Sequence, residues 1–92
     1  MPDEPWELSI APPAQRDIAS RLPAAVVHAC LDYIEHAVLL NPWRVGKPLR
    51  WELAGVWSAR QGDYRVLYEI DEPNRTVVLL RIAHRRDAYR RT

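Results

Sequence analysis

Cysteine is nearly absent from this sequence of 92 residues, which contains only Cys30. A single cysteine can form neither an internal disulfide nor a cysteine-based zinc site. Long apolar stretches are missing as well: no uninterrupted run exceeds four residues, whereas a membrane-spanning helix needs about 20. The first ten residues also lack the basic segment and apolar stretch of a secretory signal. We therefore expect a cytoplasmic protein without a transmembrane segment.

Motifs for nucleotide or metal chemistry are also missing. The sequence has no P-loop, no dinucleotide-binding glycine motif and no zinc-protease motif. Its carboxylates are scattered singly, which is unlike a two-metal nuclease. His28 and His36 have no third ligand nearby in the sequence, so structural or surface roles are favoured over metal binding. Cys30 lies among apolar residues and is expected in the core. We expect neither a metal nor another cofactor.

The composition is that of one globular domain spanning residues 1–92. Hydrophobic residues make up 48% and charged residues 27%, close to the averages for globular proteins. The net charge of +1 conceals an asymmetry between the two halves. Residues 1–43 hold two basic and six acidic residues, whereas residues 44–92 hold eleven basic and six acidic ones. Ten of those eleven are arginines, the residue best suited to bidentate phosphate contacts. The second half therefore predicts a polyanionic partner. The alternative is that arginine is simply common in proteins encoded by a GC-rich genome.

Hydrophobic periodicity predicts an α+β fold. Period-two alternation indicates strands, and apolar residues three or four apart between 27 and 38 indicate a helix. The predicted elements are, in chain order, a strand at Trp6–Ile10, helices at Ala14–Arg21 and Ala24–Leu40, and strands at Val56–Arg60, Tyr64–Asp71 and Thr76–Ala83. Residues 43–53 are expected to be irregular. We expect the helical hairpin to cover one face of a four-stranded sheet whose last three strands form an antiparallel meander.

The expected core follows from the same alternation. On the second meander strand we expect Val66 to be buried together with Tyr68 or Leu67. On the last strand we expect burial of Val78, Leu80 and Ile82. The opposite face of the sheet is then free to carry a site.

Basic residues gather at the ends of the predicted meander strands. Arg60 and Arg65 flank a short turn, so their side chains are neighbours if they share a face. Arg81 lies on the last strand, and a basic tail follows it. Arginines combined with an aromatic ring, here Tyr89, suit single-stranded RNA, because guanidinium groups bind phosphates and rings stack on bases. The alternative is a solvated strand face with scattered ion pairs, such as Arg65 with Glu69.

These residues also carry a resemblance. The stretch from Leu53 to Arg91, LAGVWSARQGDYRVLYEIDEPNRTVVLLRIAHRRDAYRR, resembles the RelE/ParE toxin superfamily of type II toxin–antitoxin systems. The upstream RVGKPLR, Arg44–Arg50, resembles its actinobacterial RelE-like branch. The motifs cover about half of the chain, and the strand–helix–helix order of the rest is similar.

The resemblance implies a toxin that cuts mRNA in the ribosomal A site without a metal and that a cognate antitoxin silences in a hetero-oligomer. In this reaction the 2′-hydroxyl of the mRNA attacks the adjacent phosphate and the 5′-oxygen leaves. Two alternatives stay open. ParE-like members of the superfamily inhibit DNA gyrase instead, and the same scaffold could serve as a non-catalytic RNA-binding module.

Carried over residue by residue, the resemblance implies catalytic roles for Arg65, Arg85 and Tyr89. The two arginines neutralise charge that builds up on the phosphorane, and Tyr89 stacks on a base or orients the scissile nucleotide. Further RNA contacts are expected from Arg60, Lys47, Arg50, Arg81, Arg86 and Arg90. Many ribonuclease members carry lysines where this sequence has Val56 and Ser58. His84 is the candidate for the general base because its ordinary pKa lies near 6.5, although a structural role for it at the strand end is equally compatible.

Overall fold

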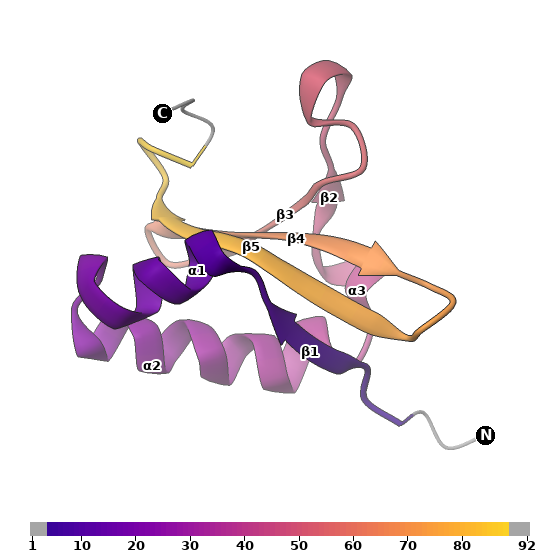
Figure 1. Ribbon diagram of the computed structural model, residues 1–92, viewed down its shortest axis with the longest axis horizontal. Coiled ribbons are helices and arrows are strands. Elements are labelled where there is room, and N and C mark those ends of the chain that lie inside the picture. Colours follow the sequence, from indigo (N-terminus) through magenta and orange to yellow (C-terminus); the bar gives the residue numbers. More distant parts are fainter. Residues whose placement is uncertain (1–3, 89–92) are drawn as a thin grey trace.

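The computed structural model describes residues 4–88, which form a single sheet with helices on one side (Figure 1). The strands are β1 (Glu7–Ile10), β2 (Lys47–Pro48), β3 (Trp57–Gln61), β4 (Tyr64–Asp71) and β5 (Thr76–His84). The helices are α1 (Pro12–Arg16), α2 (Ala24–Tyr33) and α3 (Pro42–Val45), with a 3₁₀ turn at Trp51–Leu53. The α+β class and the element order agree with the prediction from the sequence.

The sheet has five strands in the order β1-β5-β4-β3-β2. β1 runs parallel to β5, and every other neighbouring pair is antiparallel. The expectation of four strands was wrong because β2 lies in the segment expected to be irregular. Lys47–Pro48 is too short for alternation to show in the sequence, and proline is tolerated there because β2 is an edge strand.

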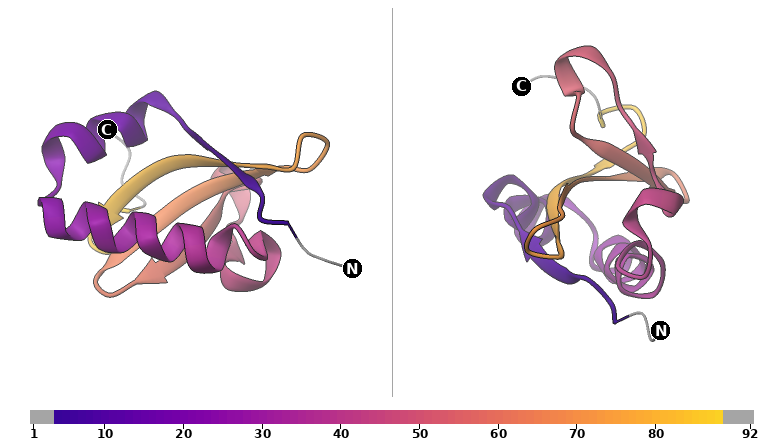
Figure 2. Two further views of the ribbon diagram at one scale, coloured as in Figure 1. Left: turned by 90° about the horizontal axis from the view of Figure 1, so that it is seen from below. Right: turned by 90° about the vertical axis from the view of Figure 1, so that its right-hand side faces the viewer.

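Both helical segments pack on the same face of the sheet, as predicted (Figure 2). α1 continues as a π-helical turn at Asp17–Arg21, where the Leu22 amide donates to the Asp17 carbonyl. α2 continues in the same way over Ile34–Val38, so the predicted helix from Ala24 is continuous as far as Val38. Pro12 occupies the first turn of α1, where its missing N–H costs nothing.

The core lies between these helices and the sheet. Cys30, Ile34 and Val38 recur every fourth residue along α2 and its extension, and all three are buried. They face a set of buried strand residues that includes Ala59, Val66, Tyr68, Val77, Leu79 and Ile82. The buried Tyr68 hydroxyl donates to the Pro42 carbonyl at 2.6 Å, which ties β4 to α3. Burial raises the pKa of Tyr68 to about 12, so this donor is kept protonated.

A β-bulge in β5 explains why part of the predicted core of this strand was wrong. Leu67 pairs with Arg81, but Tyr68 pairs with Leu79, so Leu80 is an extra residue on β5. One extra residue exchanges the two faces of a strand. Burial consequently shifts from Val77 and Leu79 before the bulge to Ile82 after it. The expected burial of Ile82 is confirmed, while that of Val78 and Leu80 was wrong because both are only partly buried.

β4 buries more than alternation predicts. Val66 and Tyr68 face the helices, and Leu67 between them is also only 6% exposed. Leu67 points to the opposite face, since neighbouring strand residues alternate. Other residues on that face therefore cover Leu67 and shield it from solvent.

Candidate nucleic-acid interface

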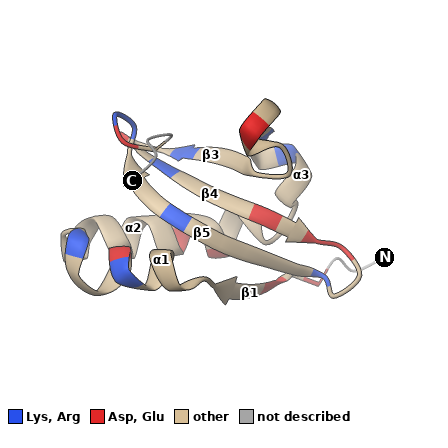
Figure 3. Ribbon diagram, turned by 45° about the horizontal axis from the view of Figure 1, so that its top comes forward, with Lys and Arg blue, Asp and Glu red and all other residues tan. Residues whose placement is uncertain are grey.

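The face of the sheet opposite the helices, called here the open face, carries a row of basic side chains. Strand register decides which residues share it: Arg60 pairs with Arg65, Ser58 with Leu67, and Lys47 with Ser58. Paired residues point to the same face, and alternate residues along a strand do so too. On this rule the open face comprises Lys47, Ser58, Arg60, Arg65, Leu67, Arg81 and Ala83. Basic residues consequently lie on β3, β4 and β5 near one end of the sheet (Figure 3).

Two segments project from the side of the sheet on which the open face lies. One is the connection between β2 and β3, which includes the turn at Trp51–Leu53, and the other is the turn that follows β5 (Figures 1 and 2). They rise near opposite ends of the face, while α1 and α2 lie on the other side. The open face thus has one projecting segment near each end, with the basic residues of β3, β4 and β5 nearer the turn after β5.

Arg65 lies in the middle of this basic row, on β4 between Arg60 of β3 and Arg81 of β5. Its side chain is partly buried, and its Nε atom is buried without a hydrogen-bond partner among residues 4–88. Leaving a buried charged donor unpaired costs about 1–3 kcal/mol or more, so native proteins rarely do so without a reason. The Arg60 Nε beside it donates to the Gly62 carbonyl at 3.2 Å, across the hairpin turn. Arg65 therefore lies at the centre of the basic row with one enclosed donor that is unpaired in the described chain.

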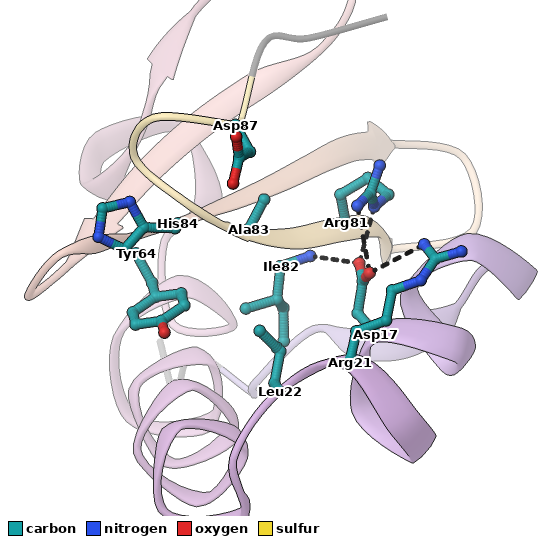
Figure 4. Close-up of a pocket in the computed structure, with 9 residues that line it drawn as sticks. All are labelled: Asp17, Arg21, Leu22, Tyr64, Arg81, Ile82, Ala83, His84 and Asp87. Atoms are coloured by element: carbon teal, nitrogen blue, oxygen red, sulfur yellow. Dashed lines mark hydrogen bonds and ion pairs between the residues drawn. The ribbon is translucent and has the colours of Figure 1, made fainter. Parts of the chain in front are cut away.

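Arg81 is held differently, by the buried carboxylate of Asp17. Its Nε donates to Asp17 Oδ2 at 2.7 Å and its Nη2 to Oδ1 at 3.2 Å, while the Ile82 amide donates to Oδ2 at 3.0 Å (Figure 4). β1 pairs with β5 only as far as Leu79. Beyond that point none of the described strands covers this edge of β5, and Asp17 accepts the hydrogen bond of the Ile82 amide instead. Sequence reasoning missed Asp17, although its position three residues after the buried Ala14 places it on the core side of the helix.

A cavity of about 230 Å³ opens at this free edge of β5 (Figure 4). Its lining includes the carboxylates of Asp17 and Asp87 as well as Arg21 and Arg81. Arg21 adds a longer ion pair to Asp17, at 3.4 Å. The two carboxylates offset Arg21 and Arg81, which already pair with Asp17, so this cavity lacks the excess of positive charge that a phosphate site needs. The open face is the better place for a polyanion.

His84 does not lie with Arg65. It pairs with Tyr64, and their rings meet edge to face at 5.4 Å between centroids, whereas Arg65 pairs with Ala83 and so points the other way. The Nδ1 atom of His84 accepts from the Arg86 amide at 3.2 Å. In the neutral ring, Nε2 then carries the proton. The structure thus separates the candidate base from the basic row and engages its accepting nitrogen.

The remaining predicted site residues lie around the edges. Arg85 and Arg86 are exposed in the turn after β5, where the Arg85 amide donates to the Asp63 carbonyl at 2.8 Å. This bond fastens the turn to the β3–β4 hairpin. Lys47 and Arg50 are exposed at the other end, on and just after β2. Tyr89 and Arg90 lie outside the described residues.

Metal-binding potential is weak in the part of the chain that the structure describes. One group of possible ligands occurs there, Asp32, Glu35 and His36, and all three are exposed. His36 pairs with the Asp32 carboxylate at 3.2 Å. A hydrogen bond to the Asp32 backbone is the largest cause that raises the pKa of His36, and the negative charges of Asp32 and Glu35 raise it further. The group lies on the helical layer rather than on the open face.

Within residues 4–88, none of the helices combines the length and hydropathy needed to cross a bilayer.

Comparison with known proteins agrees with the motifs. Residues 8–89 match the family model of the ParE toxin of type II toxin–antitoxin systems. Toxin RelE of Mycobacterium tuberculosis is 44% identical over 88 residues, which cover 96% of this chain and 90% of that protein. Toxin RelG of the same organism is 46% identical over 87 residues, covering 95% and 99% respectively.

The fold matches as well. The crystal structure of the toxin–antitoxin complex RelBE2 from Mycobacterium tuberculosis contains a chain that superposes with a TM-score of 0.82 at 43% identity. The match covers 88% of this chain and 99% of that one. Sequence motifs, family model and fold all agree, and the chain therefore belongs to the RelE/ParE family of toxins from type II toxin–antitoxin systems.

Proposed function

We propose that this toxin is a ribosome-dependent mRNA endoribonuclease that works without a metal and blocks translation. The observation that carries the proposal is the partly buried Arg65 beside Arg60 on the open face. Positive charge that is in position before the substrate arrives is what electrostatic catalysis needs, because less reorganisation is then required in the transition state.

The proposed reaction is an internal transfer of the phosphoryl group. The 2′-oxygen of one nucleotide attacks the adjacent phosphorus, the bond to the 5′-oxygen breaks, and a 2′,3′-cyclic phosphate and a 5′-hydroxyl result. The proton lost by the 2′-hydroxyl is balanced by the proton that the 5′-oxygen gains. Arg65 and Arg85 stabilise the extra negative charge of the phosphorane, and Tyr89 stacks on a base at the cleavage point.

The RNA would lie along the open face. Arg60 beside Arg65 and the exposed Arg86 and Arg50 at the two ends supply phosphate contacts, each with an electrostatic and salt-dependent contribution. Lys47 and Arg90 belong to the same proposed set. Arg81 contributes less, because Asp17 already occupies two of its donors. The ribosome positions the mRNA, since the toxin itself offers only part of a binding site.

The general base is the open point of the mechanism. His84 serves as the base through Nδ1 only if the bond from the Arg86 amide is released, so its action requires the turn after β5 to rearrange on the ribosome. Substitution of His84 by Gln keeps an acceptor and removes the titrating ring. If His84 is the base, this variant loses most of its cleavage rate, and a rate within threefold of wild type excludes the role.

We further propose that a cognate antitoxin covers the open face. The solved relative from Mycobacterium tuberculosis is a toxin–antitoxin complex, and a basic face suits an acidic or amphipathic segment. Such a segment would occupy the surface that the mRNA otherwise uses. Inhibition is then competitive with the RNA.

Gyrase inhibition is the second candidate function. Two observations favour it: His84 lies on the face opposite Arg65, and Ser58 rather than a cation lies beside Lys47 on the open face. A gyrase inhibitor needs no catalytic groups, so neither feature would matter to it.

The experiment that tests the proposal compares the two activities of one purified toxin. The toxin is added to ribosomes that carry an mRNA with a defined A-site codon, to the same mRNA without ribosomes, and to gyrase in a supercoiling assay. Cleavage only on ribosomes supports the endoribonuclease. Intact mRNA together with blocked supercoiling assigns the chain to the gyrase inhibitors.

A further inference from the structure

Trp51 is the most exposed large apolar side chain of the described residues, at 87% exposure. It opens the 3₁₀ turn at Trp51–Leu53, in the connection that projects beside the open face. Exposing an entire indole to water is unfavourable, because the ring would gain from almost any burial. The sequence motifs discussed above give this ring no role.

The backbone of Trp51 is also unusual. Its φ is +55°, a left-handed conformation that is unfavourable for a residue other than glycine. Neighbouring hydrogen bonds hold the turn in this form: the Ala54 amide donates to the Trp51 carbonyl at 2.9 Å, and the Leu49 amide to the Val56 carbonyl at 2.8 Å. Backbone hydrogen bonds therefore hold the turn that carries this exposed ring.

The charges around this turn indicate what the ring meets. Lys47 and Arg50 precede Trp51 in the chain and are exposed. Cations next to an exposed aromatic ring are the elements of a single-stranded nucleic-acid site, in which the ring stacks on a base and the cations bind phosphates. Aromatic residues and Arg are also enriched in protein interfaces, so binding of a protein partner by this turn is the alternative outcome of the test.

The distance along the face fits a flanking nucleotide. Trp57, where β3 begins, is three residues from Arg60, which corresponds to about 10 Å of strand. The Trp51 turn precedes Trp57 and so lies beyond that point, at the opposite end of the open face from the turn after β5. A base at Trp51 is therefore not the base at the cleaved phosphate.

We propose that Trp51 stacks on an unpaired RNA base that flanks the cleavage point and thereby fixes the RNA along the open face. The inference rests on the proposed endoribonuclease function and adds a binding residue to it. The base belongs either to the mRNA or to ribosomal RNA. In the first case replacement of Trp51 alters the preference for the flanking nucleotide, and in the second it lowers cleavage of all mRNA sequences alike.

The test uses three variants of the full chain. Trp51→Gly removes the ring and suits the φ of +55°, so a loss cannot come from added strain. Trp51→Phe keeps a stacking ring, and Leu53→Ala, 38% exposed in the same turn, is the matched control. Cleavage on programmed ribosomes gives kcat and KM, and affinity for the antitoxin is measured for each protein.

We expect Trp51→Gly to lower kcat/KM by about tenfold or more, mainly through KM, since stacking on one base contributes about 1–3 kcal/mol. Trp51→Phe and Leu53→Ala should stay within about threefold of wild type. Unchanged cleavage by Trp51→Gly overturns this inference but leaves the proposed function standing. So does a loss of antitoxin affinity with normal cleavage, because the turn is then a protein interface. A wild-type toxin that cleaves nothing overturns the inference and the proposed function together.

Discussion

Asp17 shows how one buried residue can organise the edge of a functional face. Its carboxylate is 1% exposed and accepts from the Arg81 side chain and the Ile82 amide. It thus fixes the course of β5 where β1 no longer covers it, and it draws Arg81 toward the helices. The free charge of the open face is left to the residues on β3 and β4.

Replacing Asp17 by Asn therefore destabilises the fold. Asn keeps one acceptor for the Ile82 amide but loses the charge that binds Arg81. We expect the free energy of unfolding in urea to fall by about 2 kcal/mol, as for a charged hydrogen bond lost inside a protein. Asp32→Asn, an exposed carboxylate on α2, should change it by less than about 0.5 kcal/mol. Equal effects of the two substitutions would contradict the role given to Asp17.

At the scale of elements, β4 is joined to α3 through the Tyr68 hydroxyl and the close approach of Gly46. A Cβ added at Gly46 would collide with that hydroxyl and lie 3.1 Å from the Ser58 carbonyl oxygen. Gly46→Ala should therefore cost about 1–3 kcal/mol of stability, as overpacking does. The cost should shrink in a Tyr68→Phe background, because the colliding atom is gone. A double-mutant cycle by urea denaturation measures this, and additive effects would rule out the contact.

The same hydroxyl gives the fold an alkaline limit. The pKa of Tyr68 is about 12 in the folded protein and about 10 in an unfolded chain. Between these values the unfolded chain loses the proton first, so stability that is complete below pH 10 decreases as the pH rises, by up to about 1.4 kcal/mol per unit. We expect wild type to exceed Tyr68→Phe by about 1 kcal/mol at pH 7 and this advantage to disappear above pH 10. An advantage that stays constant up to pH 11 would show that the hydroxyl is not buried.

Local patterns were sufficient to predict the long elements. Tyr64–Asp71 has the predicted bounds, because alternation and the flanking turns define it. The neighbourhood of Arg60 and Arg65 also followed, since a hairpin fixes its own register. The bulge at Leu80 and the face on which His84 lies could not be predicted from local patterns, because both depend on how β5 pairs with β4. The role of Asp17 depends on a contact 64 residues away in sequence, which no local pattern contains.

In the whole molecule, the helical layer packs against one face of the sheet to form the core, and the open face is the surface proposed to bind polyanions. Antitoxin and mRNA should then compete for one surface. We expect added antitoxin to raise the apparent KM for programmed ribosomes without lowering kcat, and its association rate to fall as salt increases. Stopped-flow binding and initial-rate kinetics test both points. Inhibition that lowers kcat alone would place the antitoxin on another surface.

Arg65 is proposed to stabilise the transition state of mRNA cleavage, and single-turnover cleavage on ribosomes with a defined A-site codon measures that contribution. Arg65→Ala should cleave about 10²–10³-fold more slowly than wild type, with an unchanged circular dichroism spectrum. Arg16→Ala, an exposed arginine on the helical layer, is the matched control and should cleave at the wild-type rate. If Arg65→Ala cleaves as fast as wild type, Arg65 is not part of the catalytic machinery and the proposed site is wrong.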